Sequence, residues 1–154
     1  MALRNIIKDP DPGLRKISRE VTNFDDRLRE LIDDMRDTMH KADGCGIAAP
    51  QVGILRRAAI IETRKDFYLE MVNPEIIESG GEQIGAEGCL SIEGYNCNVA
   101  RPQYIVLRAF DRFGKRYELR LEDFEARACC HEIDHLDGIL FKDKFHSEVK
   151  KEGK

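Results

Sequence analysis

The chain has 154 residues, 42% of them hydrophobic and 35% charged, a composition typical of a globular protein that can bury a core. Its 25 lysines and arginines against 29 acidic residues give a formal net charge of −4, which argues against a general nucleic-acid binder with a broad basic surface. No apolar run approaches the ~20 residues that cross a bilayer. The N-terminus also lacks the features of an export signal. We therefore expect a cytoplasmic protein that makes no membrane contact.

The five cysteines are odd in number and irregularly spaced, so we expect free thiols in a reducing compartment, of which one could bind a metal. No repeat or linker divides the chain, which is short enough for one domain. We expect a single domain over residues 1–148 and a frayed tail over residues 149–154.

Two prolines and a glycine over residues 9–13 predict a turn. The stretch from Asp25 to Ala42 predicts an amphipathic helix, because apolar residues recur on one face, at Leu28, Leu31, Ile32, Met35 and Met39. His40 and Lys41 close this stretch, where the helix dipole favours positive charge. His40 is therefore interpreted as a helix-end charge and the methionines as core residues.

Residues 44–53 follow as a segment of small residues bounded by glycines. Glycines let a ligand or another backbone approach closely. An ordinary connection between helix and strand fits the same spacing, so spacing alone leaves both interpretations open.

The middle of the chain predicts short strands over residues 57–62, 67–72, 75–78, 104–110 and 115–121. Asn73-Pro74 is expected to end the second strand, and residues 111–114 to form a hairpin turn. Strands so close together, without intervening helices, indicate antiparallel or mixed sheets. Between them, Glu87–Ser91 places a cysteine beside a glycine, which by itself is a weak signal.

The last predicted helix begins at Glu122-Asp123 and ends near Gly138. It contains the sequence His131-Glu132-Ile133-Asp134-His135, in which the two imidazoles lie one turn apart, roughly 40° around the helix. Both can reach one metal ion, while Glu132 projects beside a metal-bound water as a general base. This arrangement is typical of metal-assisted hydrolases.

A site of this kind usually takes a third protein ligand. The extended form of the motif would have a histidine where this chain has Phe141, and the remaining tail is too short to pack back, so the ligand must come from upstream. Cys129 and Cys130 point away, at about 200° and 100° around the helix from His131, and are interpreted as packing thiols. The remaining candidates are Cys45, Cys89 and Cys97. Cys89 is favoured by its glycine neighbour and its place at a strand end.

Three segments in this order, residues 44–51, 87–91 and 131–135, resemble the signature motifs of the peptide deformylases, which remove the formyl group from the N-terminal methionine of nascent bacterial proteins. The resemblance covers roughly residues 3–145, so the predicted domain would be catalytic. With the predicted elements, it implies an α+β fold in which small antiparallel or mixed sheets pack around a central His-Glu-x-x-His helix, with an amphipathic helix nearer the N-terminus.

The resemblance also implies roles for single residues. The metal ligands would be Cys89, His131 and His135. Glu132 would take a proton from the metal-bound water that attacks the formyl carbon and deliver it to the leaving amine. The Gln51 amide and the Leu90 N–H would donate to the oxyanion. Gly46 would pair its backbone with the substrate, and Phe124 and Ala128 would help to line the methionine pocket.

The metal implied by the resemblance is Fe²⁺, which Zn²⁺, Ni²⁺ or Co²⁺ can replace. The implied partners are N-formyl-methionyl nascent peptides, with room for transient contact with the ribosome. Ligand spacing and ligand type do not choose among these metals.

The chain departs from the family pattern at two positions. Cys130 stands where a glutamine often precedes the first histidine, and Glu93 stands where a proline often follows the Leu-Ser step. Neither is a ligand position, so we expect changed packing or rim chemistry. We also expect Asp43 to pair with Arg101, which would tie the glycine segment to the strand after Cys89.

Two other interpretations remain open. A general metallopeptidase would use the same two histidines and Glu132, but would give Gln51 and Cys89 no special role. An inactive homologue would bind metal or formylated chains without turnover, and would have no need of Glu132 as a base.

Overall fold

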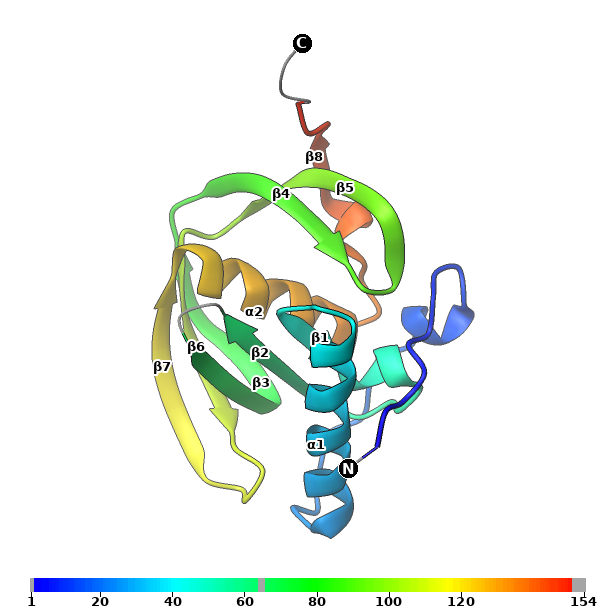
Figure 1. Cartoon of the computed structure of the whole chain (residues 1–154). Helices are drawn as coiled ribbons and strands as arrows, with labels where there is room; N and C mark the ends of the chain where they lie inside the picture. Colours follow the sequence, from blue (N-terminus) through cyan, green and yellow to red (C-terminus); the bar gives the residue numbers. More distant parts are fainter. Residues whose placement is uncertain (1, 64–65, 151–154) are drawn as a thin grey trace.

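Helix α2 (Asp123–Leu136) lies between two antiparallel sheets in the computed structural model, which describes residues 2–63 and 66–150 (Figure 1). The five-stranded sheet has the order β1 (Gly46–Ala48), β2 (Ala58–Thr63), β3 (Phe67–Gly80), β6 (Tyr104–Phe110) and β7 (Arg116–Glu122). The three-stranded sheet has the order β4 (Gln83–Cys89), β5 (Ile92–Arg101) and β8 (Phe145–Ser147). The predicted α+β class and the central position of the motif helix are confirmed.

The predicted amphipathic helix is α1 (Asp26–Lys41), and both of its ends lie within one residue of the prediction. The Asp25 side chain caps it by accepting a hydrogen bond from the Leu28 N–H at 3.1 Å. The apolar face is buried against one side of the five-stranded sheet, in a cluster that includes Leu28, Ile32, Met35, Met39, Ile47, Ile60 and Val72. Each fully buried aliphatic side chain of this kind contributes about 1.5–3 kcal/mol to folding.

Helix α2 packs on the opposite side of the same sheet. Successive side chains of a strand point to opposite faces of the sheet. In β2, Ile60 accordingly packs in the cluster under α1 and Ile61 in the cluster under α2. The α2 cluster includes Met71, Ile105, Leu107, Cys129, Cys130, Ile133 and Leu136. Cys129 and Cys130 are buried packing thiols, as predicted.

The predicted strand end at Asn73-Pro74 is wrong, since β3 continues to Gly80. The pairing of β3 with β6 shifts register between Val72 and Glu75, so Pro74, which has no N–H to donate, falls at an irregularity of the ladder. Asn73 adopts a φ of 50°, and its side chain hydrogen-bonds the N–H and the carbonyl of Val21 at 2.8 and 2.9 Å. The hydrogen bonds from Asn73 to Val21 therefore stabilise an irregularity within β3, and the strand continues beyond it.

The small-residue segment contains both the short strand β1 and the 3-10 helix η2 (Ala49–Val52). Two further 3-10 helices are η1 (Pro12–Arg15), which begins inside the turn predicted over residues 9–13 and ends beyond it, and η3 (Phe141–Lys144), after α2. Residues 149 and 150 lie in no helix or strand, and 151–154 lie outside the described residues, so the domain boundary and the frayed tail stay predictions. No helix in the described part of the chain has both the length and the apolar character needed to cross a membrane.

Candidate metal centre and active site

The side chains of Cys89, His131 and His135 converge between the β4–β5 hairpin and helix α2. One potential ligand atom from each lies within 4.8 Å of the others, and Cys89 Sγ is 3.3 Å from His135 Nε2. Among the described residues this is the one group of three or more such side chains close enough to hold a metal ion. A thiolate with two imidazoles is a donor set suited to a first-row transition metal. Of the three candidate cysteines, the structure therefore brings only Cys89 to the histidines.

Glu87 orients His131 from the side away from Cys89. The Nδ1 atom of His131 lies 2.9 Å from Glu87 Oε1, and both side chains are buried. Because a carboxylate only accepts hydrogen bonds, Nδ1 donates to Glu87, which leaves Nε2 as the nitrogen that could bind a metal. Burial would raise the pKa of Glu87, but hydrogen bonds from Arg101 and His131 hold it well below its ordinary value, so the carboxylate stays charged.

Phe141 occupies the position at which the extended motif would have a third histidine ligand, and it packs against the site. Its ring stacks on His131, with the ring centres 5.8 Å apart and the planes 25° apart. Burial holds the pKa of His135 well below its ordinary value.

Glu132 lines the same pocket as Cys89 and His131 and is only 5% exposed. Burial raises the pKa of its carboxyl group to about 7, a value suited to moving a proton at neutral pH. A Cβ atom on Gly46 would lie 2.5 Å from Glu132 Oε2. The resemblance implied that Gly46 pairs its backbone with the substrate; the structure adds that a glycine at this position makes room for Glu132.

Gln51 is held with its amide nitrogen facing Cys89. Its Oε1 accepts a hydrogen bond from the Ala48 N–H at 2.9 Å, and its Nε2 lies 3.1 Å from Ser91 Oγ and 3.6 Å from Cys89 Sγ. Ser91 therefore belongs to the site, although it was not among the predicted site residues. Leu90 is fixed in the same turn, where its carbonyl accepts a hydrogen bond from Lys8 Nζ at 3.1 Å.

A pocket opens beside this group, lined by residues that include Gly44, Gly46, Gln51, Leu90, Phe124, Ala128, His131 and Glu132. Phe124 is 46% exposed, whereas Ala128 is 7% exposed. Both predicted methionine-pocket residues thus line the cavity that reaches Glu132.

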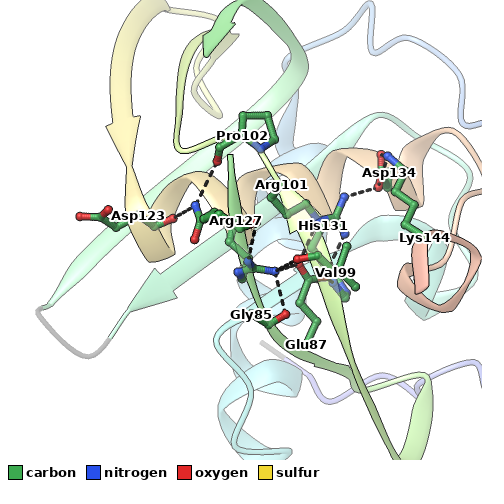
Figure 2. A network of polar contacts seen from close by, with 11 residues as sticks. Gly85, Glu87, Val99, Arg101, Pro102, Asp123, Arg127, His131, Asp134 and Lys144 are labelled. Carbon is green, nitrogen blue, oxygen red and sulfur yellow. Dashed lines mark hydrogen bonds and ion pairs between the residues drawn. The ribbon is translucent and has the colours of Figure 1, made fainter. Parts of the chain in front are cut away.

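The predicted pair of Asp43 with Arg101 is wrong. Arg101 is buried and hydrogen-bonds Glu87 through two nitrogens, at 2.9 Å each, and Asp134 at 2.6 Å (Figure 2). Arg127 reaches the same Glu87 from helix α2 at 2.6 Å. Neither arginine was predicted as a site residue. The one available signal was that Arg127 stands one turn before His131 on the same helix.

A helix enclosed by two sheets places two histidines and a buried glutamate beside a cysteine of β4, in a group that could hold a metal ion. This arrangement is typical of the metal-dependent hydrolases. The family model described as polypeptide deformylase matches residues 3–151. Peptide deformylase of Caldicellulosiruptor bescii is 51% identical over 152 residues, 99% of this chain and 91% of that protein. Peptide deformylase 1 of Bacillus subtilis is 48% identical, over 94% of this chain and 91% of that protein. The chain belongs to the polypeptide deformylase family.

Solved structures agree with this assignment. The structure of a peptide deformylase from Legionella pneumophila matches with a TM-score of 0.90 and 44% identity, over 94% of this chain and 86% of that one. That from Thermotoga maritima matches with a TM-score of 0.91 and 36% identity, over 94% and 98% of the two chains. Family membership makes the chain a hydrolase that removes the N-terminal formyl group from nascent polypeptides, and favours this activity over general peptidase activity or an inactive homologue.

Proposed function

We propose that the chain deformylates N-formyl-methionyl peptides at the group described above, with Cys89, His131 and His135 as the ligands of one Fe²⁺ ion. The observation that carries this assignment is the convergence of one thiol and two imidazoles beside a buried Glu132. When bound, the metal would acidify a water molecule and polarise the formyl oxygen. Zn²⁺, Ni²⁺ and Co²⁺ suit the same donors, so the choice of iron rests on the resemblance alone.

Glu132 is the general base and then the general acid of the proposed reaction. Its carboxylate takes the proton of the attacking water and later gives it to the nitrogen of the leaving amine, so that formate and a free N-terminus are the products. A pKa of about 7 supports both transfers, because neither form of the carboxyl group is then strongly favoured at neutral pH.

Gln51 and Leu90 stabilise the charge that develops on the formyl oxygen in this proposal. The Gln51 amide is already oriented by Ala48 and Ser91, so little reorganisation is needed when charge appears. The Leu90 N–H lies in the turn next to Cys89 and would be the second donor.

The substrate would bind as an added strand. Strand β1, which contains Gly46, stands at the edge of the five-stranded sheet and pairs with β2 on one side. An edge strand can accept an extended peptide through main-chain hydrogen bonds. The methionine side chain would then enter the pocket between Phe124 and Ala128. We further propose a cytoplasmic location and transient contact with the ribosome, where nascent chains emerge.

The test is an anaerobic assay of formate release from a formyl-methionyl peptide, with the iron-loaded protein. An unformylated peptide and a longer peptide with internal bonds serve as controls. Formate release without internal cleavage supports the proposal, and metal-loaded protein that releases none refutes it. Cys89→Ala should lose metal affinity; unchanged affinity would overturn its assignment as a ligand.

A further inference from the structure

The β4–β5 hairpin meets helix α2 across a buried polar cluster made of Glu87, Arg101, Arg127, His131 and Asp134 (Figure 2). Glu87 and Arg101 belong to the hairpin, and the other three belong to α2. Three pairs of side chains within this cluster join the two elements: Arg127 with Glu87, His131 with Glu87, and Asp134 with Arg101. The proposed metal ligands also come from both sides of this interface, because Cys89 ends β4 and the two histidines are on α2.

Arg127 forms the most extensive of these contacts. Its Nη1 donates to Glu87 Oε2 at 2.6 Å, to the Val99 carbonyl at 3.1 Å and to the Gly85 carbonyl at 3.2 Å, and its Nη2 donates to the Gln83 carbonyl at 3.4 Å. All four acceptors belong to the hairpin. The residue is 5% exposed. One helical side chain therefore holds both strands of the hairpin.

The backbone of the hairpin is fitted to this side chain. A Cβ atom on Gly85 would lie 3.2 Å from Arg127 Nη2, closer than an ordinary contact, so glycine at this position leaves room for the guanidinium. An arginine also suits the position better than a lysine, since its planar fork can donate to a carboxylate and to several carbonyls at once.

Spacing along both elements connects Arg127 to the metal group. Arg127 stands one helical turn before His131. Glu87 stands two residues before Cys89 on β4, and both side chains reach α2, Glu87 at His131 Nδ1 and Cys89 at His135 Nε2. We propose that Arg127 is a positioning residue of the metal centre, which holds the hairpin at the separation from α2 at which Cys89 reaches His131 and His135. This inference rests on the proposed ligand set.

Arg101 has a different role in the same cluster. It lies on β5 and binds Glu87 within the hairpin, so that pair orients the carboxylate without fixing the distance to the helix. Its contact with Asp134 does cross the interface, but near the C-terminal end of α2. Arg127 thus holds the hairpin to α2 on the N-terminal side of His131, whereas the Arg101–Asp134 contact lies on its C-terminal side.

The experiment measures metal release, which does not depend on turnover. Wild type, Arg127→Met and Arg127→Lys are loaded with Co²⁺, and the rate of Co²⁺ transfer to a chromogenic chelator is recorded with the thiolate-to-Co²⁺ absorption band. We expect release to be about 10–100-fold faster in Arg127→Met, with a shifted or weakened band, and an intermediate rate in Arg127→Lys.

The matched control is Arg112→Met. Arg112 is a half-buried arginine with two carboxylate partners, Glu70 at 2.8 Å and Asp33 at 2.9 Å, but none of these residues lines the pocket or belongs to the ligand group. Both methionine variants should lower the melting temperature of the protein without added metal, whereas only Arg127→Met should release Co²⁺ faster. Equal release from the two variants would show that Arg127 is merely structural.

Two further outcomes are decisive. If Arg127→Met does not fold, Arg127→Lys with wild-type release and an unmoved band overturns the inference. If wild type itself shows no thiolate-to-Co²⁺ band, the ligand set is wrong and the inference falls with it; a normal wild-type band with equal release rates refutes the inference alone.

Discussion

The two faces of helix α2 are packed by different kinds of interaction. The face toward the five-stranded sheet is apolar, with Ala126, Cys129, Ile133 and Leu136 set against Ile61, Met71, Ile105 and Leu107. The face toward the β4–β5 hairpin is ionic, with Glu87 between two arginines and a histidine. The proposed metal ligands lie on the ionic side. Apolar contacts stabilise without direction, whereas charge-assisted hydrogen bonds fix distance and angle.

The two faces differ in what they contribute to the free energy of folding. Burying an aliphatic side chain contributes about 1.5–3 kcal/mol, so the apolar face supplies a large part of the stability. A buried ion pair must offset the desolvation of both charges, and replacing it by apolar residues of similar volume is often neutral. The ionic face is therefore poorly explained by stability. It is well explained by the need to hold Cys89 and the histidines in a fixed arrangement.

The largest effect is expected from Glu132→Gln, which should lower the rate of deformylation about 10²–10⁴-fold by removing the general base. The fold should survive, because Glu132 Oε1 has no hydrogen-bond partner among the described residues and a neutral amide costs less to bury than a carboxylate. Metal content by elemental analysis, with the rate of formate release, separates loss of the base from loss of the site. A variant that keeps more than half of wild-type activity would contradict the role.

Breaking the ionic face by Arg101→Met should lower the free energy of unfolding by about 3–5 kcal/mol, because the buried Glu87 loses one of its partners and the half-buried Asp134 keeps only Lys144. Metal release should also become faster. Urea unfolding gives the first quantity and chelator transfer the second. Unchanged stability would mean that the cluster rearranges around the missing charge, and that the contrast between the two faces is weaker than we state.

The matched change on the apolar face is Leu107→Ala, which should cost about 2–5 kcal/mol by leaving a cavity next to α2. Leu107 lies on β6, away from the ligands, so metal release from the folded variant should stay within twofold of wild type. The same two measurements apply. A large increase in metal release would show that the apolar face also sets the geometry of the site.

Sequence reasoning recovered the elements whose pattern is local. The stripe from Leu28 to Met39 predicted α1 within one residue at each end, and the spacing of His131 and His135 placed both imidazoles on one side of α2. It failed at Asn73-Pro74, where contacts with Val21, distant in sequence, allow the strand to continue.

The polar cluster could not be predicted for a related reason. Glu87, Arg101 and Arg127 stand in segments whose pattern says only that they are half-buried, and any of the acidic residues could have paired with Arg101. The choice of Asp43 followed from proximity to the glycine segment, whereas the fold places Glu87 and Asp134 on either side of the guanidinium. Side-chain pairing across two sheets depends on register and docking, which no local pattern contains.

The smallest effect on stability is expected in a partly exposed ion cluster around Glu62. This cluster is a useful comparison with the ionic face of α2, which is more deeply buried. Glu62 on β2 binds Arg36 through two nitrogens at 2.9 Å each and His40 at 2.7 Å, and its side chain is 22% exposed. The hydrogen bond from Arg36 outweighs burial and, with His40, lowers the pKa of Glu62 from 4.5 to about 2. The charged carboxylate therefore stabilises the fold above pH 4.5, and this contribution is lost as the pH falls toward 2.

Glu62→Gln should accordingly lower the free energy of unfolding by about 1 kcal/mol at pH 7, because water screens a partly exposed cluster. The difference from wild type should shrink between pH 4.5 and pH 2, when the wild-type carboxylate becomes protonated. Denaturant unfolding of both proteins across this range measures it, with Glu30→Gln, an exposed change on α1, as the control. A difference that stays constant with pH would mean that shape and not charge carries the contact. In that case the positioning of Cys89 could equally depend on the shape of the side chains on the ionic face of α2, and not on their charge.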